Sequence, residues 1–298
     1  MDKPVQPTWP VSSDPLGRKV HRFKSEWSSL DYMTEGDPAL PPLVLLQSLE
    51  YPGWPGQEFC ALAEDAGFRT VSVRRPGFGS VPSQPNLDQQ VALIGAFLDA
   101  LDDQPMVVAT LGTSNTFGYR LARHPKVKLL VLSNCCFNYN PLAEIQPDWF
   151  AKHMEQTLTS EAGARLALMG LKSARALFGK FWVVESFMQK SAGDLEYLRS
   201  NRELFAEAAD CVVDGVDIHT FIMELRTTLK DDIFLQDGCF NGAPVIAVSG
   251  EENSDRWKTK VRAEAERVGV PLHFFPSGDA LVIHQCAGEF LDLVQQHS

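Results

Sequence analysis

Apolar and polar segments alternate along the chain in a way that predicts strands and helices in turn. Short, continuous apolar runs bounded by turn residues are typical of strands that are covered on both faces. Four such runs occur in the first half of the sequence, at 42–46, 69–73, 106–111 and 127–133. Between them, apolar residues recur at helical spacing, most clearly at Leu87, Val91, Ile94, Leu98 and Leu101. Strands that alternate with helices predict right-handed crossovers and a doubly wound, mostly parallel α/β sheet.

A long helical stretch interrupts this alternation. From about 137 to 237 nearly every segment has helical spacing, including 161–177 and 194–209. The sequence Ser191-Ala192-Gly193-Asp194 has the pattern of a capped helix start within this stretch. The strand and helix patterns then resume, at 244–249, 254–268 and 271–275, and a closing helix follows.

These patterns predict an α/β core made of two segments and one insertion. The core comprises residues 1–136 and 240–298, and residues 137–239 form an inserted helical cap. Before the first buried strand, residues 1–18 are rich in Pro and Ser and are expected to form a surface arm. The runs at 21–27 and 29–33 are expected to be edge strands.

Composition limits the partners that this chain can have. Its 298 residues are 44% hydrophobic, which is enough for a full globular core. A formal net charge of −11 argues against nucleic acid and membrane partners, because both need clustered Lys and Arg. The chain shows no apolar leader and no spanning segment, so we expect a cytoplasmic protein. Its six cysteines contain no C-x-x-C pair, so neither a metal site nor another cofactor is expected. The oligomeric state stays open.

A candidate nucleophile follows the run 106–111. The sequence Gly112-Thr113-Ser114-Asn115-Thr116 stands between a predicted strand and a predicted helix. A nucleophilic serine in such a position sits on a strained turn that exposes its hydroxyl, and small neighbours allow the turn to form. Ser114 is therefore the candidate nucleophile, although Thr116 stands where a second glycine is usual.

Several segments together resemble the α/β-hydrolase fold of the lidded type. They are the strand at 42–46 with its loop, the sequence Arg75-Pro76-Gly77-Phe78-Gly79-Ser80, the turn 112–116 with its helix, and the strand at 244–249 with Gly250. The resemblance covers about residues 20–298. It implies a catalytic site at the turn, with the backbone N–H groups of Leu49 and Asn115 as the donors that bind an oxyanion.

The same resemblance implies that the two groups needed to activate the serine have been replaced. The acid of the family corresponds to Asn253 here, and the histidine corresponds to Asp279. An amide does not stabilise a developing imidazolium, and an ordinary carboxylate is a weak base toward a serine hydroxyl. In addition, Gln47-Ser48 replaces the His-Gly pair that precedes one of the oxyanion donors.

Three functions therefore compete. The leading one is a lidded pocket that binds a small, mainly apolar carbonyl or acyl compound and converts it, if at all, without hydrolysis. A second is a serine esterase-like hydrolase in which His284, five positions after Asp279, takes the place of the missing histidine. A third is a binding or interaction protein that has kept the scaffold alone.

Overall fold

The computed structural model describes residues 13–49, 51, 53–189, 191–231 and 236–298. Most of the expected surface arm, residues 1–12, lies outside the described residues. Within them, eight strands form a single sheet with the order β1-β2-β4-β3-β5-β6-β7-β8. The strands are β1 (Val20–Lys24), β2 (Ser29–Glu35), β3 (Pro42–Leu46), β4 (Arg69–Arg74), β5 (Met106–Leu111), β6 (Val127–Ser133), β7 (Val245–Gly250) and β8 (Leu272–Phe275).

The sheet is mostly parallel, as its alternating pattern predicts. β1 and β2 add an antiparallel edge to β4, and the strands from β4 to β8 run parallel. The first edge strand is shorter than the predicted 21–27, because the chain turns after Lys24 and Ser25 N–H donates to Ser28 O at 2.8 Å.

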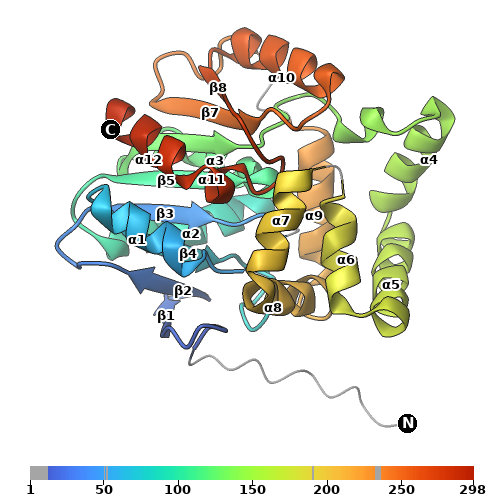
Figure 1. Cartoon of the computed structure of the whole chain (residues 1–298), viewed down its shortest axis with the longest axis horizontal. Coiled ribbons are helices and arrows are strands. Elements are labelled where there is room, and N and C mark those ends of the chain that lie inside the picture. The colour runs from blue at the N-terminus through green and yellow to red at the C-terminus, as the bar shows by residue number, and fades with distance from the viewer. Residues whose placement is uncertain (1–12, 50, 52, 190, 232–235) are drawn as a thin grey trace.

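Helices cover both faces of this sheet, so the doubly wound prediction is confirmed. Alternate residues of a strand point to opposite faces. Leu43 of β3 accordingly packs in one cluster with α1 and α12, whereas Val44 packs in the other with α2, α3 and α10. In Figure 1, α1 and α12 lie in front of the sheet. The covering helices are α1 (Gln57–Asp65), α2 (Leu87–Leu101), α3 (Asn115–Leu121), α10 (Asp255–Val268), α11 (Val282–Gln285) and α12 (Ala287–His297), and a short 3₁₀ turn, η1 (Gly112–Ser114), precedes α3.

A helical insertion, the segment between β6 and β7, lies at one end of the sheet (Figure 1). Its elements are η2 (Pro141–Glu144), α4 (Asp148–Leu158), α5 (Glu161–Phe178), α6 (Lys180–Phe187), α7 (Ala192–Ser200), α8 (Arg202–Val213) and α9 (Ile218–Leu229). None of the helices in the described part of the chain is long and apolar enough to cross a membrane. The cap boundaries at 137 and 239 stay predictions.

Two details of the insertion compare directly with the sequence patterns. The helix start at Ser191 is confirmed, because Ser191 Oγ accepts a hydrogen bond from Asp194 N–H at 2.9 Å. The single helix expected over 194–209 is wrong. It divides into α7 and α8 at Asn201, whose backbone leaves the helical region with φ −118° and ψ 38°. The Asn201 side chain donates to Tyr197 O at 2.9 Å, which satisfies a carbonyl at the end of α7.

Backbone contacts hold the insertion against the loop after β4. Gly77 O accepts from Asp217 N–H at 2.8 Å, and Gly79 N–H donates to Gly215 O at 2.9 Å. Gly77 has a φ of +85°, and a Cβ at this position would lie 2.0 Å from the hydroxyl oxygen of Thr220 in α9. The close approach of the insertion therefore requires glycine at position 77.

Candidate functional site

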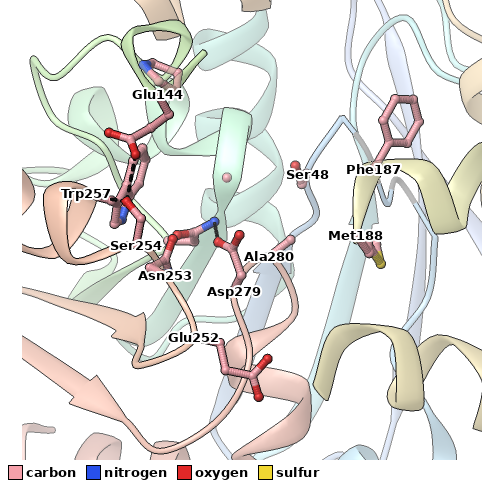
Figure 2. Close-up of a pocket in the computed structure, with 13 residues that line it drawn as sticks. Ser48, Glu144, Phe187, Met188, Glu252, Asn253, Ser254, Trp257, Asp279 and Ala280 are labelled. Atoms are coloured by element: carbon pink, nitrogen blue, oxygen red, sulfur yellow. Dashed lines mark hydrogen bonds between the residues drawn. The ribbon is translucent and has the colours of Figure 1, made fainter. Parts of the chain in front are cut away.

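A cavity of about 300 Å³ opens at the carboxyl edge of the parallel strands. This edge is where open α/β sheets bind ligands. Ser48, Gly112 and Asn134 come directly or closely after β3, β5 and β6. Phe187 and Met188, at the end of α6, lie on the same side of the cavity as Ser48 (Figure 2). The lining is Ser48, Gly112, Asn134, Pro141, Glu144, Phe187, Met188, Glu252, Asn253, Ser254, Trp257, Asp279 and Ala280.

The strained residue of the turn after β5 is Gly112. Its φ is +52°, and it is the first residue after the strand. In the nucleophile turn the strained residue is the one whose side chain faces the ligand. Gly112 lines the cavity and brings no side chain to it. The sequence carried a signal for this, because positive φ favours glycine and Gly112 directly follows the apolar run.

Ser114 stands two residues beyond the strained position, so the expectation that its hydroxyl is exposed by the turn is wrong. The residue is fully buried. Its Oγ donates to Leu46 O at 2.5 Å and accepts from Leu111 N–H at 2.7 Å. The hydroxyl therefore ties the ends of β3 and β5 together beneath the turn.

Both backbone donors expected for an oxyanion are engaged inside the protein. Leu49 N–H donates to Thr113 Oγ1 at 2.9 Å, and Asn115 N–H donates to Gly112 O at the start of α3. The Asn115 side chain is also used, since its Nδ2 donates to Ser133 O at 2.9 Å. An oxyanion site needs preorganised donors that point at the developing charge. Leu49 and Asn115 do not supply it in this arrangement.

A buried ion pair lies directly behind Thr113. The Thr113 hydroxyl donates to Glu224 Oε2 at 3.1 Å, and the other oxygen of this α9 carboxylate pairs with Arg75. The two charged side chains are 1% and 0% exposed. Arg75 also donates through Nε to Gln47 O at 2.7 Å. A carboxylate thus stands next to the place where a hydrolase stabilises negative charge.

The structure brings Asp279 and Asn253 together on one wall of the cavity, as Figure 2 shows. Asp279 Oδ1 accepts from Asn134 Nδ2 at 2.9 Å. Asn253 Nδ2 donates to Gly250 O at 3.2 Å. The sequence reasoning missed Asn134, which has a φ of +48° directly after β6. Asparagine is one of the few residues that adopt this backbone conformation readily, which was the available signal.

Two carboxylates join the insertion to the loops that carry this wall. Asp194 of α7 is buried and accepts the backbone N–H groups of Asp279, Ala280 and Leu281 at 3.2, 2.8 and 3.2 Å. Burial raises the pKa of Asp194 despite these bonds. In the opposite direction, Glu252 accepts from Ser191 Oγ at 2.6 Å and from Gly193 N–H at 3.1 Å. The loop containing Asp279 is therefore positioned by the insertion.

His284 lies outside this cavity. Its ring stacks on Tyr197 and meets Phe59 edge-on, and these residues line a separate hollow of about 170 Å³. Its Nε2 lies 3.4 Å from the side-chain oxygen of Gln47. Gln47 in turn donates to Ser72 Oγ at 3.4 Å, so it connects His284 to the sheet. Burial lowers the pKa of His284 to about 4. The structure does not bring His284 to Ser114, whose hydroxyl bonds to backbone groups.

No family model and no curated protein sequence matches the chain. Solved structures do match it. An α/β hydrolase fold protein from Nakamurella multipartita has a TM-score of 0.59 at 20% identity, over 94% of this chain and 98% of that one. The Cif epoxide hydrolase from Acinetobacter nosocomialis has a TM-score of 0.66 at 16% identity, over 94% and 89%. The enol-lactonase from Burkholderia xenovorans LB400 has a TM-score of 0.62 at 15% identity, over 93% and 99%. The chain has the α/β-hydrolase fold.

The match to these solved structures confirms the resemblance to the α/β-hydrolase fold that the strand and turn segments indicated. Its coverage of nearly the whole chain includes the insertion as well as the sheet. At identities of 20% or less these matches establish the fold alone. The activity has to be argued from the residues of the site.

Removing one partner of the buried pair is expected to be strongly destabilising. Glu224→Leu leaves the Arg75 charge buried without its carboxylate, and we expect a loss of about 3–5 kcal/mol in the free energy of unfolding. The double variant Arg75→Met/Glu224→Leu leaves no unpaired charge and should lose less than the single variant. Urea unfolding measures both, and a single variant no worse than the double would contradict this account.

His284 is expected to make stability depend on pH. Its imidazole titrates near pH 4 when folded and near 6.5 when unfolded, so the unfolded chain binds the proton more readily. The free energy of unfolding is therefore unaffected by His284 above about pH 6.5, and it decreases as the pH falls toward 4, by up to about 3 kcal/mol. His284→Gln should flatten this slope in urea unfolding, whereas the exposed His219 replaced by Gln should leave it unchanged.

Proposed function

We propose that the cavity binds a small polar molecule and that the protein does not hydrolyse it through a covalent serine intermediate. The observation that carries this proposal is the residue at the strained position, because Gly112 offers no nucleophilic atom to the cavity. Covalent catalysis needs a nucleophile within hydrogen-bond reach of a base. Ser114 is held by Leu46 and Leu111 instead.

The surroundings of Thr113 support the same proposal. Attack on an ester generates an oxyanion, which hydrolases stabilise with free N–H donors. Here Leu49 N–H already bonds to Thr113, and Glu224 lies behind that hydroxyl. A carboxylate near the developing oxyanion raises its energy, even when Arg75 neutralises part of the field.

The lining favours a ligand that is positively charged or rich in hydrogen-bond donors. Three carboxylates, from Glu144, Glu252 and Asp279, line the cavity together with the amides of Asn134 and Asn253. Among the described residues that line the cavity, none is Lys, Arg or His. We therefore propose a polar ligand, whereas the sequence led us to expect a mainly apolar one. Negatively charged walls in a chain of net charge −11 repel carboxylate ligands.

Any conversion in this cavity is assigned to proton transfer rather than hydrolysis. Asp279 is the candidate acid or base, since its carboxylate lines the cavity and is oriented by Asn134. The esterase alternative would need His284 beside Ser114. The aromatic packing of His284 and its place in another hollow weigh against that alternative.

The absence of a serine mechanism can be tested with Ser114. Ser114→Ala should leave p-nitrophenyl acetate turnover at background, and a fluorophosphonate probe should not label the wild-type protein. The substitution should cost about 1–3 kcal/mol of stability, because Leu111 N–H and Leu46 O lose a buried partner. Loss of a measured esterase activity in the folded variant would refute the proposal.

Gly112 provides the complementary test. Ester turnover by the double variant Asn253→Asp/Asp279→His should stay at background, because no nucleophilic hydroxyl stands at position 112. Adding Gly112→Ser to this pair should raise ester turnover, since general-base activation contributes about 10²–10⁴-fold when a hydroxyl is present. Gly112→Ala in the same background is the matched control, because it carries the same backbone strain without a hydroxyl. Equal rates for the Ser and Ala variants would show that position 112 is not the nucleophile position.

Ligand charge can be tested with ethanolamine, ethylene glycol and glycolate, which have similar sizes and different charges. Thermal shift titrations should rank ethanolamine first and glycolate last. Asp279→Asn should weaken ethanolamine binding about 10–100-fold, the usual value of a charge-assisted hydrogen bond. The exposed Asp292→Asn is the control and should have no effect. Preferred binding of glycolate would overturn the assigned ligand class.

A further inference from the structure

The insertion exposes several large hydrophobic side chains. Large hydrophobic side chains of α4, α5 and α6 are exposed there, with Trp149 at 70% and Leu177 at 76%. In Figure 1 these helices lie at the margin of the molecule, with α4 and α5 beyond α6 and away from the sheet. We define the arm patch as the exposed residues Trp149, Phe150, Leu166, Met169, Leu177, Phe178, Trp182 and Phe187.

The arm patch follows the geometry of its helices. Leu166, Met169 and Leu177 are spaced by three and eight positions, which places them along one side of α5. Phe178 and Trp182 have ring centroids 4.9 Å apart across the junction with α6, and those of Trp149 and Phe150 are 5.8 Å apart in α4. These contacts group the aromatic rings in pairs on the surface.

The area of the arm patch is closer to that of an interface than to an ordinary surface. With roughly 150–250 Å² for each aromatic side chain and about as much for each of the three aliphatic ones, the exposed fractions give a combined apolar area on the order of 800 Å². The largest patch on a typical monomer is about 300–600 Å². A stable protein–protein interface buries about 800 Å² on each partner. The arm patch therefore has the size that a stable dimer needs.

The distribution of charge favours a second copy of the chain as the partner. Residues 148–187 contain five basic and four acidic side chains, a net charge of +1, which leaves −12 for the rest of the protein. Two copies approaching through other surfaces would repel each other, whereas two copies of the segment 148–187 would repel each other only weakly. The nearly neutral segment 148–187 also lacks the basic cluster that an anionic membrane requires.

We propose that the arm patch is a self-association surface and that the protein forms a two-fold dimer through α4, α5 and α6. In such a dimer the same patch is buried on both copies. Phe187 belongs to the patch and also lines the cavity, so the interface adjoins the rim of the ligand site. This proposal is independent of the ligand and of any activity.

Sedimentation velocity between 1 and 100 µM tests the proposal with the full chain. The wild type should sediment as a dimer at high concentration. Trp149→Glu should raise the dissociation constant at least tenfold, because it buries a charge at the interface. Trp27→Glu is the matched control, since Trp27 is 52% exposed and lies outside the arm patch. This variant should leave the dimer intact.

Three outcomes would overturn the proposal. They are a monomeric wild type at 100 µM, equal dissociation by the two tryptophan variants, and cosedimentation of the wild type with phosphatidylcholine vesicles that Trp149→Glu abolishes. The last outcome would assign the arm patch to a lipid surface instead. If Trp149→Glu fails to fold by circular dichroism, Leu177→Glu replaces it, because that side chain is still more exposed.

Discussion

The buried Arg75–Glu224 ion pair holds together four segments, and two of them, those after β3 and β5, contribute Ser48 and Gly112 to the cavity. Arg75 comes from the loop after β4 and donates to the backbone of Gln47 after β3. Glu224 comes from α9 and accepts from Thr113 in the turn after β5. The guanidinium also lies over the rings of Phe78 and Phe117, at 4.9 and 5.0 Å. Such a pair offsets its desolvation only when its hydrogen bonds are well made, so these segments must keep one arrangement.

The alternation of apolar runs was sufficient to predict the sheet, because burial on both faces constrains every residue of a strand such as β3. Local rules also predicted the start of α7 at Ser191. They failed at Asn201, where the helix ends through a backbone conformation that no apolar periodicity encodes. Helix ends depend on such single side chains more than on the pattern around them.

The candidate site was predictable only in part. Asp279 and Asn253 both line the cavity, since both follow strands whose order was recognised, and their correspondence to the catalytic groups of the family stays a prediction. The motif drew attention to the hydroxyl of Ser114, but the strained dihedral falls on Gly112. Glu224 was missed because it bonds to Thr113 across 111 positions of sequence. Contacts of that range depend on how the insertion packs, and one sequence carries little information about this packing.

The insertion carries apolar residues both against the core and on its exposed surface, which is unusual for helices that pack on a core. Its inner side reaches the core through apolar residues such as Phe205 and Phe221 as well as through the carboxylates of Asp194 and Glu224, and Trp149 and Leu177 are exposed. Polar anchors make the inner contact specific in position. The apolar residues that remain are left for the surface, where water is a poor partner for them.

Asp194 of the insertion binds amides of the core, and Glu252 of the core binds the insertion. This reciprocal pair of contacts has a consequence for the motion of α7. Asp194 holds three consecutive amides of the core, and Glu252 holds Gly193 N–H at the start of the same helix. Lifting α7 away from the core breaks both sets of hydrogen bonds at once, because each set joins α7 to the core. A displacement of α7 would therefore expose these four amides to solvent together.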